Sequence, residues 1–390
     1  MSKSVDLNEV IRAIQGVLPV DKSFIGLHEP KFSGREWDYV KECLDTGWVS
    51  SVGKFVDEFE AGLAAYTGAG YAVATVNGTA ALHICLKLVG VEPGDEVLMP
   101  ALTFIATANA VSYCGAVPHF ADISESTLGL DPDKLDQYLK DISEIRAEGC
   151  FNRLTGRRIK AVVPMHTFGH PVDMDVLSDV AERYKLELVE DAAEALGSYY
   201  KGKHAGCFGK VSALSFNGNK ILTTGGGGAI LTNNQDLARL AKHITTTAKT
   251  AHKWAFNHDM IGYNYRLPNI NAAMGCAQLE QLPVFLEQKR SLANHYKEAF
   301  SGIKGIKFVT EPVHSKSNYW LNAILLDEPN EAHLESLLEM TNNMGIMTRP
   351  VWTPMHKLPM FESCPGMLLT TTENIQRRLI NIPSGAMLGE

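Results

Sequence analysis

The sequence predicts an α/β protein with a large, mostly parallel sheet domain and a smaller α+β domain. Short apolar segments alternate with helix-like segments from Tyr71 to Glu190, the pattern of βα units whose sheet is covered by helices on both faces. Beyond Phe300, a shorter series of strand-like and helix-like segments follows. A chain of 390 residues is long enough for two such domains.

The segment before the sheet is predicted to be mainly helical. Apolar residues share one face of a helix over residues 6–17, and an extended arm follows over 24–30. Ser33 and Glu36 have the spacing of a capping box, which would start a helix that runs to Leu44. The next predicted segments are a loop over 47–53 and a helix over 55–66.

The predicted sheet domain consists of alternating strands and helices. Its strands are expected at Tyr71–Val76, Glu96–Met99, Val117–Ala121, Arg158–Pro164 and Leu186–Glu190, and its helices at Ala80–Leu88, Phe104–Tyr113 and Asp175–Tyr184. Ligands of open parallel sheets bind beyond the carboxyl ends of the strands, so polar residues at those ends are candidates for a site. The polar stretch 142–157 is predicted to be a surface excursion.

A hairpin with a lysine in its turn follows these segments. Two apolar strands, Val211–Ser215 and Ala229–Thr232, enclose Lys220 and the four glycines 225–228. Glycine lets backbone approach closely, and a lysine in such a pocket can lose its proton and act as a nucleophilic amine. A plain surface lysine on a hairpin would have the same local sequence.

The rest of the chain begins with an aromatic loop over residues 245–266, and loops of this length are usually functional or interfacial. A helix is predicted over 272–300, with a break at Pro283. Strands at 306–309 and 322–326 and a helix at 333–342 would form the smaller domain. The predicted division is an N-terminal helix and arm (1–24), a large domain (25–285) and a small C-terminal domain (286–390).

Composition excludes several classes of protein. The net charge of −8 argues against a general nucleic-acid binder, which would carry clustered basic residues. Seven cysteines without a CxxC pair indicate neither a disulfide framework nor a zinc site. Apolar runs fall short of the roughly 20 residues that span a bilayer, and the N-terminus lacks the layout of a signal peptide. We expect a reduced, cytoplasmic protein that binds neither membranes nor nucleic acid.

Residues at three strand ends suit one cofactor. Gly78 and Thr79 stand where a strand meets a helix N-terminus, which suits a phosphate, although a plain turn would look the same. Phe104 can stack on a flat ring or serve only in packing. Asp191 can hold a proton on a ring nitrogen or cap the next helix. Together with the nucleophilic Lys220, these features are what a pyridoxal 5'-phosphate (PLP) enzyme requires.

Eight segments across the chain form a recognisable set: Ser23–Leu27, Gly47–Gly53, Asn77–Leu82, Thr103–Thr107, Glu190–Ala193, Ser215–Lys220, Gly262–Arg266 and Asn381–Ser384. With these segments the sequence resembles, over nearly its whole length, the sugar aminotransferases of the DegT/DnrJ/EryC1/StrS family. These are PLP-dependent transferases of fold type I, the aspartate aminotransferase architecture. Gly345–Trp352 and Met355–Met360 most resemble the branch that acts on nucleotide-linked 4-keto-6-deoxy-N-acetylhexosamines.

The resemblance implies a role for each matched residue near the cofactor. Lys220 would bind PLP covalently and, once displaced, would move a proton between the cofactor and C4 of the sugar. Asp191 would pair with the ring nitrogen, and Phe104 would stack on the ring. The phosphate would be held by Gly78, Thr79 and Ser215.

The resemblance also implies contacts from elsewhere in the assembly. Asn264 would reach the phosphate from the neighbouring subunit, so a homodimer with shared active sites would be the working unit. Glu194 stands where many relatives have glutamine or histidine near the cofactor's hydroxyl, and a charged carboxylate there would need a proton or a cationic neighbour. Substrate contacts from the smaller domain are expected at Tyr319, Arg349, Trp352 and His356.

The implied reaction moves the amino group of L-glutamate to C4 of a UDP- or GDP-linked 4-keto-6-deoxy-N-acetylhexosamine, in the biosynthesis of amino sugars for surface polysaccharides such as lipopolysaccharide. The alternatives are a PLP-dependent dehydratase, in which histidine replaces the lysine, and a PLP-binding regulator without catalysis. Lys220 disfavours the dehydratase. A metal-dependent hydrolase is disfavoured because His166 and His170 follow a strand with Gly169 between them, whereas a zinc pair at this spacing shares a helix face.

Overall fold

A computed structural model describes residues 5–19 and 22–390 of the chain. Its largest sheet has nine strands in the order β1-β11-β10-β7-β6-β2-β3, with the hairpin β4–β5 attached to β6. Strands β11 and β5 run against the other seven, which confirms a mostly parallel sheet. The strands are β1 (Tyr71–Thr75), β2 (Glu96–Pro100), β3 (Val117–Ala121), β4 (Ser143–Arg146), β5 (Gly149–Asn152), β6 (Arg158–Val162), β7 (Glu187–Asp191), β10 (Val211–Ser215) and β11 (Gly228–Thr232).

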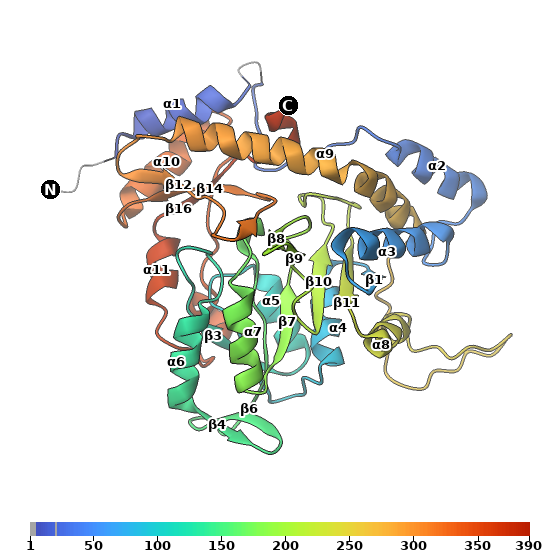
Figure 1. Cartoon of the computed structure of the whole chain (residues 1–390). Coiled ribbons are helices and arrows are strands. Elements are labelled where there is room, and N and C mark those ends of the chain that lie inside the picture. The colour runs from blue at the N-terminus through green and yellow to red at the C-terminus, as the bar shows by residue number, and fades with distance from the viewer. Residues whose placement is uncertain (1–4, 20–21) are drawn as a thin grey trace.

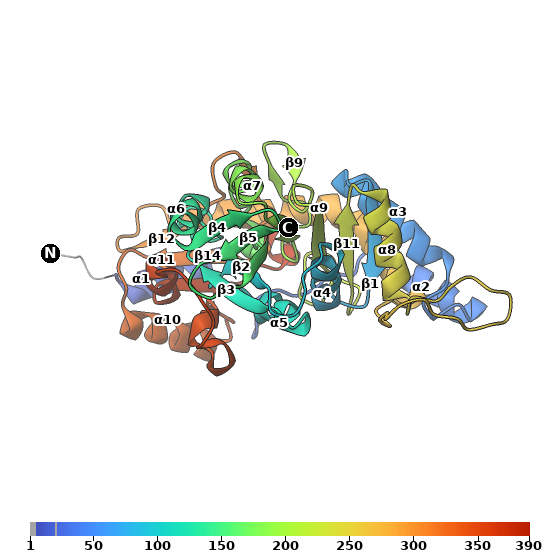
Figure 2. The ribbon, with the colours of Figure 1, turned by 90° about the horizontal axis from the view of Figure 1, so that it is seen from below.

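Helices cover both faces of this sheet, as the apolar strand sequences require. Figure 2 shows α4 and α5 on one face and α6 and α7 on the other. Each pair packs with the strands in its own core cluster, one around Leu82 and Val111 and the other around Leu135 and Leu177. The helices are α4 (Gly78–Leu88), α5 (Ile105–Tyr113), α6 (Pro132–Ile142) and α7 (Met174–Arg183), with α3 (Lys54–Thr67) and α8 (Gln235–Thr245) at the edge formed by β1 and α2 (Glu36–Thr46) packed against α9 (Asn269–Ala299).

A second sheet is antiparallel, in the order β12-β14-β16-β15. Helix α1 (Leu7–Val17) buries Val10, Ile11 and Ile14 against the elements of this region and the C-terminal half of α9. Figure 1 shows α1 and the C-terminus both lying along α9. The elements are β12 (Ile306–Phe308), β14 (Asn322–Leu326), α10 (Glu331–Asn343), β15 (Arg349–Pro350), α11 (Thr370–Gln376) and β16 (Leu379–Ile382), with a small third sheet of β8 (Tyr199–Tyr200), β9 (Lys203–His204) and β13 (Ser315–Lys316).

Helix α9 (Asn269–Ala299) continues through Pro283, so the predicted break at this proline is wrong. A proline inside a helix costs about 3 kcal/mol, but Leu282 and Phe285 are buried beside it and keep the helix in place. The helix also crosses the predicted boundary at 285/286. The division into 1–24, 25–285 and 286–390 stays a prediction. Residues 1–4 and 20–21, which belong to its first part, lie outside the described part of the chain.

The capping box predicted at Ser33 is also wrong. Helix α2 begins at Glu36 after Arg35, and no side chain caps it. The Ser33 hydroxyl donates instead to Gln281 Oε1 over 2.7 Å, and Glu36 Oε2 accepts from the N–H of Gly34. Contacts with α9 thus replace the local hydrogen bonds that define a capping box.

The polar stretch 142–157 contains the hairpin β4–β5, whose residues 144–148 are exposed, as expected for a surface excursion. Two of its polar residues bond into the fold. Asn152 Nδ2 and the Thr155 hydroxyl donate to the buried carboxylate of Glu96 at 2.9 and 2.6 Å, and His119 bonds the same group. A buried charge requires such partners, so Asn152 and Thr155 of this stretch stabilise the Glu96 carboxylate.

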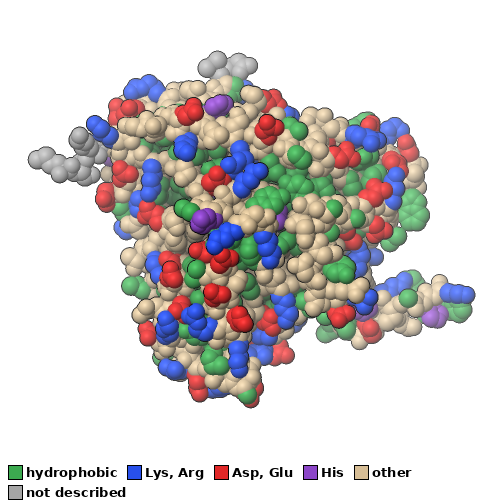
Figure 3. All heavy atoms as spheres, in the orientation of Figure 1, with side chains coloured by type: hydrophobic (Ala, Val, Ile, Leu, Met, Phe, Trp, Pro, Cys, Tyr) green, Lys and Arg blue, Asp and Glu red, His purple; other side chains and the backbone are tan. Residues whose placement is uncertain are grey.

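The aromatic loop after α8 projects away from the rest of the chain in Figures 1 and 2, and Figure 3 shows its mixture of basic and apolar side chains. Trp254, Phe256 and Ile261 are exposed on it. The seven cysteines are free. Among the described residues, no helix has the length and apolar character needed to cross a membrane.

The hydrophobic cluster between α3, β1 and α9 gives a stability prediction. Phe59 is fully buried and packs edge-on against Phe216, with the ring centroids 5.1 Å apart. Replacing Phe59 with alanine should lower the free energy of unfolding by about 3–5 kcal/mol, because it removes apolar contacts and leaves a cavity. Denaturant unfolding measures this loss. The control Leu154→Ala, at an exposed position, should change it by less than about 0.5 kcal/mol.

Candidate active site

A cavity of about 610 Å³ lies beyond the carboxyl ends of β7 and β10, beside the start of α4. Segments far apart in the sequence meet here, as expected for an open α/β sheet. Most of the residues predicted from the sequence line it: Gly78, Thr79, Phe104, Asp191, Glu194, Ser215, Lys220, Arg349 and Trp352.

The start of α4 forms one end of the cavity. The side chain of Asn77 caps the helix by accepting from the N–H of Ala80 over 2.8 Å. The N–H groups of Gly78 and Thr79, in the first turn, have no acceptor within the helix. A Cβ on Gly78 would lie 2.9 Å from Ser215 Cβ, so glycine is what brings this helix end against the serine. The result is a set of N–H and hydroxyl donors that suits a phosphate.

Asp191 lies at the end of β7 in the buried wall. Its Oδ2 accepts from the Thr107 hydroxyl over 2.7 Å, and its Oδ1 accepts from the N–H of Ala193 over 3.2 Å. Burial raises the pKa of this carboxyl, against the effect of these hydrogen bonds and of Lys220. A carboxylate held in this way gains from a cationic N–H partner, which a protonated ring nitrogen supplies.

Lys220 follows β10 in the turn before the glycine run, and its side chain is only 12% exposed. Its Nζ lies 3.3 Å from Glu194 Oε1 and 3.7 Å from the centre of the Trp320 ring. Nζ therefore faces a carboxylate oxygen and the face of an aromatic ring, two groups that attract a cation. The lysine is thus a partly buried, paired side chain and not the surface lysine of a plain hairpin.

Glu194 is paired with Lys220. This pairing supplies the cationic neighbour that a charged carboxylate at this position requires. The Oε2 of Glu194 accepts from the N–H of Phe168 over 2.9 Å, while Oε1 faces Lys220. Burial raises the pKa of Glu194 to about 7, although Lys220 and the Phe168 N–H act in the opposite sense. This carboxyl therefore changes charge near neutral pH.

Aromatic side chains form the opposite wall. The ring of Trp352 lies 6.2 Å from that of Phe104 and 5.2 Å from that of Phe168. Phe104 immediately precedes α5 and is 49% exposed, so its ring is open to a ligand. Arg349 stands at the rim, where it donates to Asn342 Oδ1 and to the Thr348 carbonyl. The rim thus offers a cation for an anionic ligand.

Three predicted site residues do not line the cavity in this chain. The Tyr319 side chain is buried, and its hydroxyl accepts from the N–H of Glu311. His356 bonds Glu373 over 3.2 Å. Asn264 is exposed and forms a bridge with Thr246 in the projecting loop.

Trp320 and Thr107 were not predicted and belong to the site. Trp320 lines the cavity beside Lys220, and Thr107 bonds Asp191 outside the lining. The threonine could have been found, because it closes the segment Thr103–Thr107 that carries the resemblance. For Trp320, the local sequence gives no indication that this residue, and not its aromatic neighbour Tyr319, lines the cavity.

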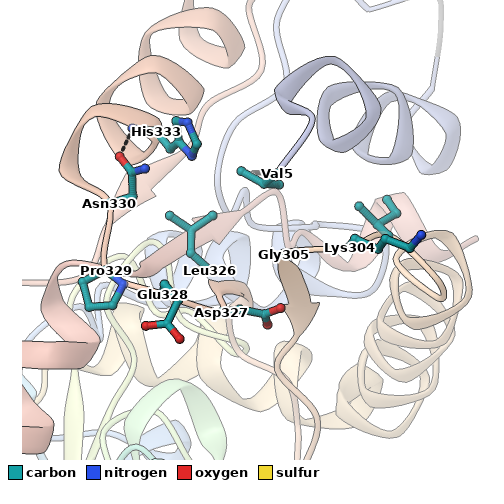
Figure 4. Close-up of a pocket in the computed structure, with 10 residues that line it drawn as sticks. Val5, Lys304, Gly305, Leu326, Asp327, Glu328, Pro329, Asn330 and His333 are labelled. Carbon is teal, nitrogen blue, oxygen red and sulfur yellow. Dashed lines mark hydrogen bonds between the residues drawn. The ribbon is translucent and has the colours of Figure 1, made fainter. Parts of the chain in front are cut away.

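Figure 4 shows a second hollow, of about 800 Å³, between the start of α10, the end of β14 and the segment before α1. Its polar groups already serve the fold. Asn330 caps α10 by accepting from the N–H of His333, and the N–H of Asp327 donates to the carbonyl of Gly305. None of the predicted site residues lines it.

The two histidines that follow β6, His166 and His170, lie elsewhere in the interior. His166 Nε2 bonds Glu190 over 3.0 Å, and burial lowers the pKa of His170 to about 4. Among the described residues, no group of three or more possible ligands is arranged around a metal position.

A fold of this type, with a lysine, an aspartate and a helix N-terminus around one cavity, is typical of a PLP-dependent aminotransferase of fold type I. Residues 30–390 match the DegT/DnrJ/EryC1/StrS aminotransferase family, and the chain belongs to it. The GDP-perosamine synthase of Caulobacter vibrioides is 37% identical over 369 residues, which cover 94% of each chain. The GDP-perosamine synthase of Escherichia coli O157:H7 is 36% identical over 364 residues, with 93% of each chain covered.

A solved structure of the same family has the same fold. The crystal structure of a DegT DnrJ EryC1 StrS aminotransferase from Brucella abortus has a TM-score of 0.81 and 28% identity, and 90% of each chain is covered. The protein is accordingly a PLP-dependent sugar aminotransferase. The described residues fit PLP, because the first turn of α4 and Ser215 would hold the phosphate and the buried Asp191 would hold the ring nitrogen. When bound, PLP supplies an electron sink for breaking and forming bonds at the amino carbon.

The start of α4 gives a prediction about cofactor binding. A Cβ on Gly228 would lie 2.6 Å from the carbonyl carbon of Asn77 and 2.7 Å from Gly78 N, whereas one on Gly226 has its nearest contact at 4.0 Å. Gly228→Ala should therefore displace the helix end and weaken PLP binding at least tenfold, and Gly226→Ala should not. Absorbance titration with PLP measures both affinities, with thermal melting to confirm folding.

Proposed function

We propose that this cytoplasmic enzyme moves the amino group of L-glutamate to C4 of a nucleotide-linked 4-keto-6-deoxy-N-acetylhexosamine. The observation that carries the proposal is the placement of Lys220 in the cavity whose rim holds Arg349 and Trp352. A cationic and aromatic rim suits the diphosphate and the rings of a sugar nucleotide.

Each residue of the site has a share in this reaction. Lys220 lies deep in the cavity and would move a proton at C4 of the sugar. Asp191 would stabilise positive charge on the ring nitrogen of the cofactor. Phe104 and Trp352 would orient the substrate and exclude water from the reacting atoms, which strengthens every charge interaction inside.

The relatives named GDP-perosamine synthase favour a second candidate substrate, a GDP-linked 4-keto-6-deoxyhexose without the N-acetyl group. The two candidates differ at C2 of the sugar, and only the second is restricted to GDP as the nucleotide. Both need the same lysine, aspartate and phosphate anchor, so the distinction depends on the rim of the cavity.

The substrate prediction uses purified enzyme that has been converted to its amino form by L-glutamate. UDP- and GDP-linked 4-keto-6-deoxy sugars, with and without the N-acetyl group, are then added separately. The cognate sugar should restore the original absorbance of the cofactor and yield the 4-amino sugar by mass spectrometry. Lys220→Ala should lower the rate at least 100-fold, because the proton-transfer group is lost.

The outcome separates the candidates. Turnover of the N-acetylated sugars supports the first, and turnover of only the GDP-linked sugar without the N-acetyl group supports the second. An absence of turnover with every 4-keto sugar, in enzyme that reacts with L-glutamate, would rule out both.

We also propose that the working unit is a homodimer with shared active sites. Trp254, Phe256 and Ile261 are exposed on the projecting loop, and such apolar groups are typical of a protein interface. The loop also carries Asn264, exposed and away from the cavity of its own chain. A partner's cavity is a place where this amide could meet the phosphate.

The dimer gives its own prediction. The double variant Phe256→Ser and Ile261→Ser should raise the dimer dissociation constant at least tenfold, because it removes two buried apolar anchors from the interface. Sedimentation velocity measures the constant, and PLP affinity should fall in parallel. Leu154→Ser, at an exposed site on the β5–β6 connection, is the control. An unchanged dissociation constant in the double variant would contradict the proposal.

A further inference from the structure

The pair formed by Lys220 and Glu194 poses a problem for the lysine's chemistry. Lys220 can attack a carbonyl carbon only as the free amine. Its Nζ faces the Glu194 carboxylate and the ring of Trp320, two groups that attract a cation. With 12% of the lysine side chain and 1% of the glutamate side chain exposed, water has little access to collect the proton that must leave.

We propose that Glu194 is the proton acceptor of Lys220. One Nζ–H bond of the lysine breaks as one O–H bond forms at Oε1 of Glu194, which leaves a free amine and a neutral carboxylic acid. The same proton returns when the lysine is charged again. The inference rests on the family's cofactor chemistry and not on the identity of the sugar.

The hydrogen bonds around Glu194 direct it to this task. The N–H of Phe168 holds Oε2, so that Oε1 is left facing Nζ at 3.3 Å. The Nδ2 of Asn318 donates to the backbone carbonyl of Glu194 and fixes the residue in place. A buried carboxyl favours its neutral form, and transfer from the ammonium removes both buried charges at once.

The other ionisable groups near the pair are less suited to accept the proton. Asp191 uses both oxygens in hydrogen bonds to Thr107 and Ala193. Burial, together with Lys289 and Lys220, lowers the pKa of His28 well below its usual range, so this imidazole is a weak base. Arg349 is a cation at the rim and accepts no proton.

The test follows binding of PLP to the full-length chain after the cofactor has been stripped with hydroxylamine. The rate of covalent attachment, measured by absorbance, should fall as pH drops through about 7, where Glu194 becomes protonated. Glu194→Gln should lower this rate about 100-fold or more and abolish that inflection, because the amide cannot accept the proton. No amino donor or sugar is added, so the result is independent of the proposed substrate.

Two further variants make the test specific. Glu194→Ala leaves space for a small carboxylate, and added formate should restore part of the attachment rate in this variant and not in the natural protein. Glu60→Gln is the matched control, because Glu60 is also a carboxylate bonded to a lysine, Lys242, with a side chain only 15% exposed, and burial also raises its pKa. It should attach PLP at the natural rate with the natural inflection.

The proposal would be overturned if Glu194→Gln attached PLP at the natural rate with the inflection retained. A slower rate with an unchanged inflection and no rescue by formate would also overturn it, since that result describes a purely structural role. Circular dichroism and thermal melting identify any variant that does not fold. The infrared difference spectrum between the natural protein and folded Glu194→Gln below neutral pH should contain the band of one protonated carboxyl, which gives a readout without catalysis.

Discussion

The ion pair between Glu194 and Lys220 is the constraint around which this site is built. A buried charge without partners costs several kcal/mol, so both groups need hydrogen bonds from the surrounding loops. The loop after β6 supplies the N–H of Phe168, and the segment before β14 supplies the ring of Trp320. Supplying that N–H places Phe168 at φ 56°, a left-handed conformation that a non-glycine residue adopts only when its surroundings impose it.

Asn318 joins the loops that meet at this pair. Its Nδ2 donates to the carbonyls of Glu194 and Leu196, and its Oδ1 accepts from the N–H of Trp320. A Cβ on Gly169 would lie 1.8 Å from this Oδ1, so a side chain there would displace the amide. The segment that leads into β14 of the four-stranded sheet is thereby fixed to the strand ends of the large sheet. Lys289, buried in α9, strengthens the same link by donating to the carbonyls of Trp320 and Ser384.

Local rules account for what the sequence could predict. The alternation of apolar strands and helices predicted the large sheet, and the residues at strand ends, such as Asp191 and Ser215, line one cavity as expected. What the sequence did not predict has non-local causes. Tyr319, at φ 48°, turns into the core while its neighbour Trp320 lines the cavity, and sequence periodicity does not predict a left-handed non-glycine residue. The helix at Pro283 and the failed cap at Ser33 depend on contacts with residues far away in the sequence.

This difference between local and distant determinants has a consequence for function. The proposed phosphate anchor and Asp191 each depend on a short segment, in which a strand is followed at once by a helix or a turn. Sequence motifs can therefore predict them, as suits a cofactor that a whole family shares. Trp320, Arg349 and Trp352 reach the cavity from segments around the small sheet, and their positions depend on how that sheet is fixed to the large one. Substitutions at the Asn318 junction should therefore act on the substrate side of the cavity more than on the phosphate anchor. The proposed contacts with the cofactor phosphate and ring nitrogen thus depend on local sequence, while the proposed substrate contacts depend on the packing between the two sheets.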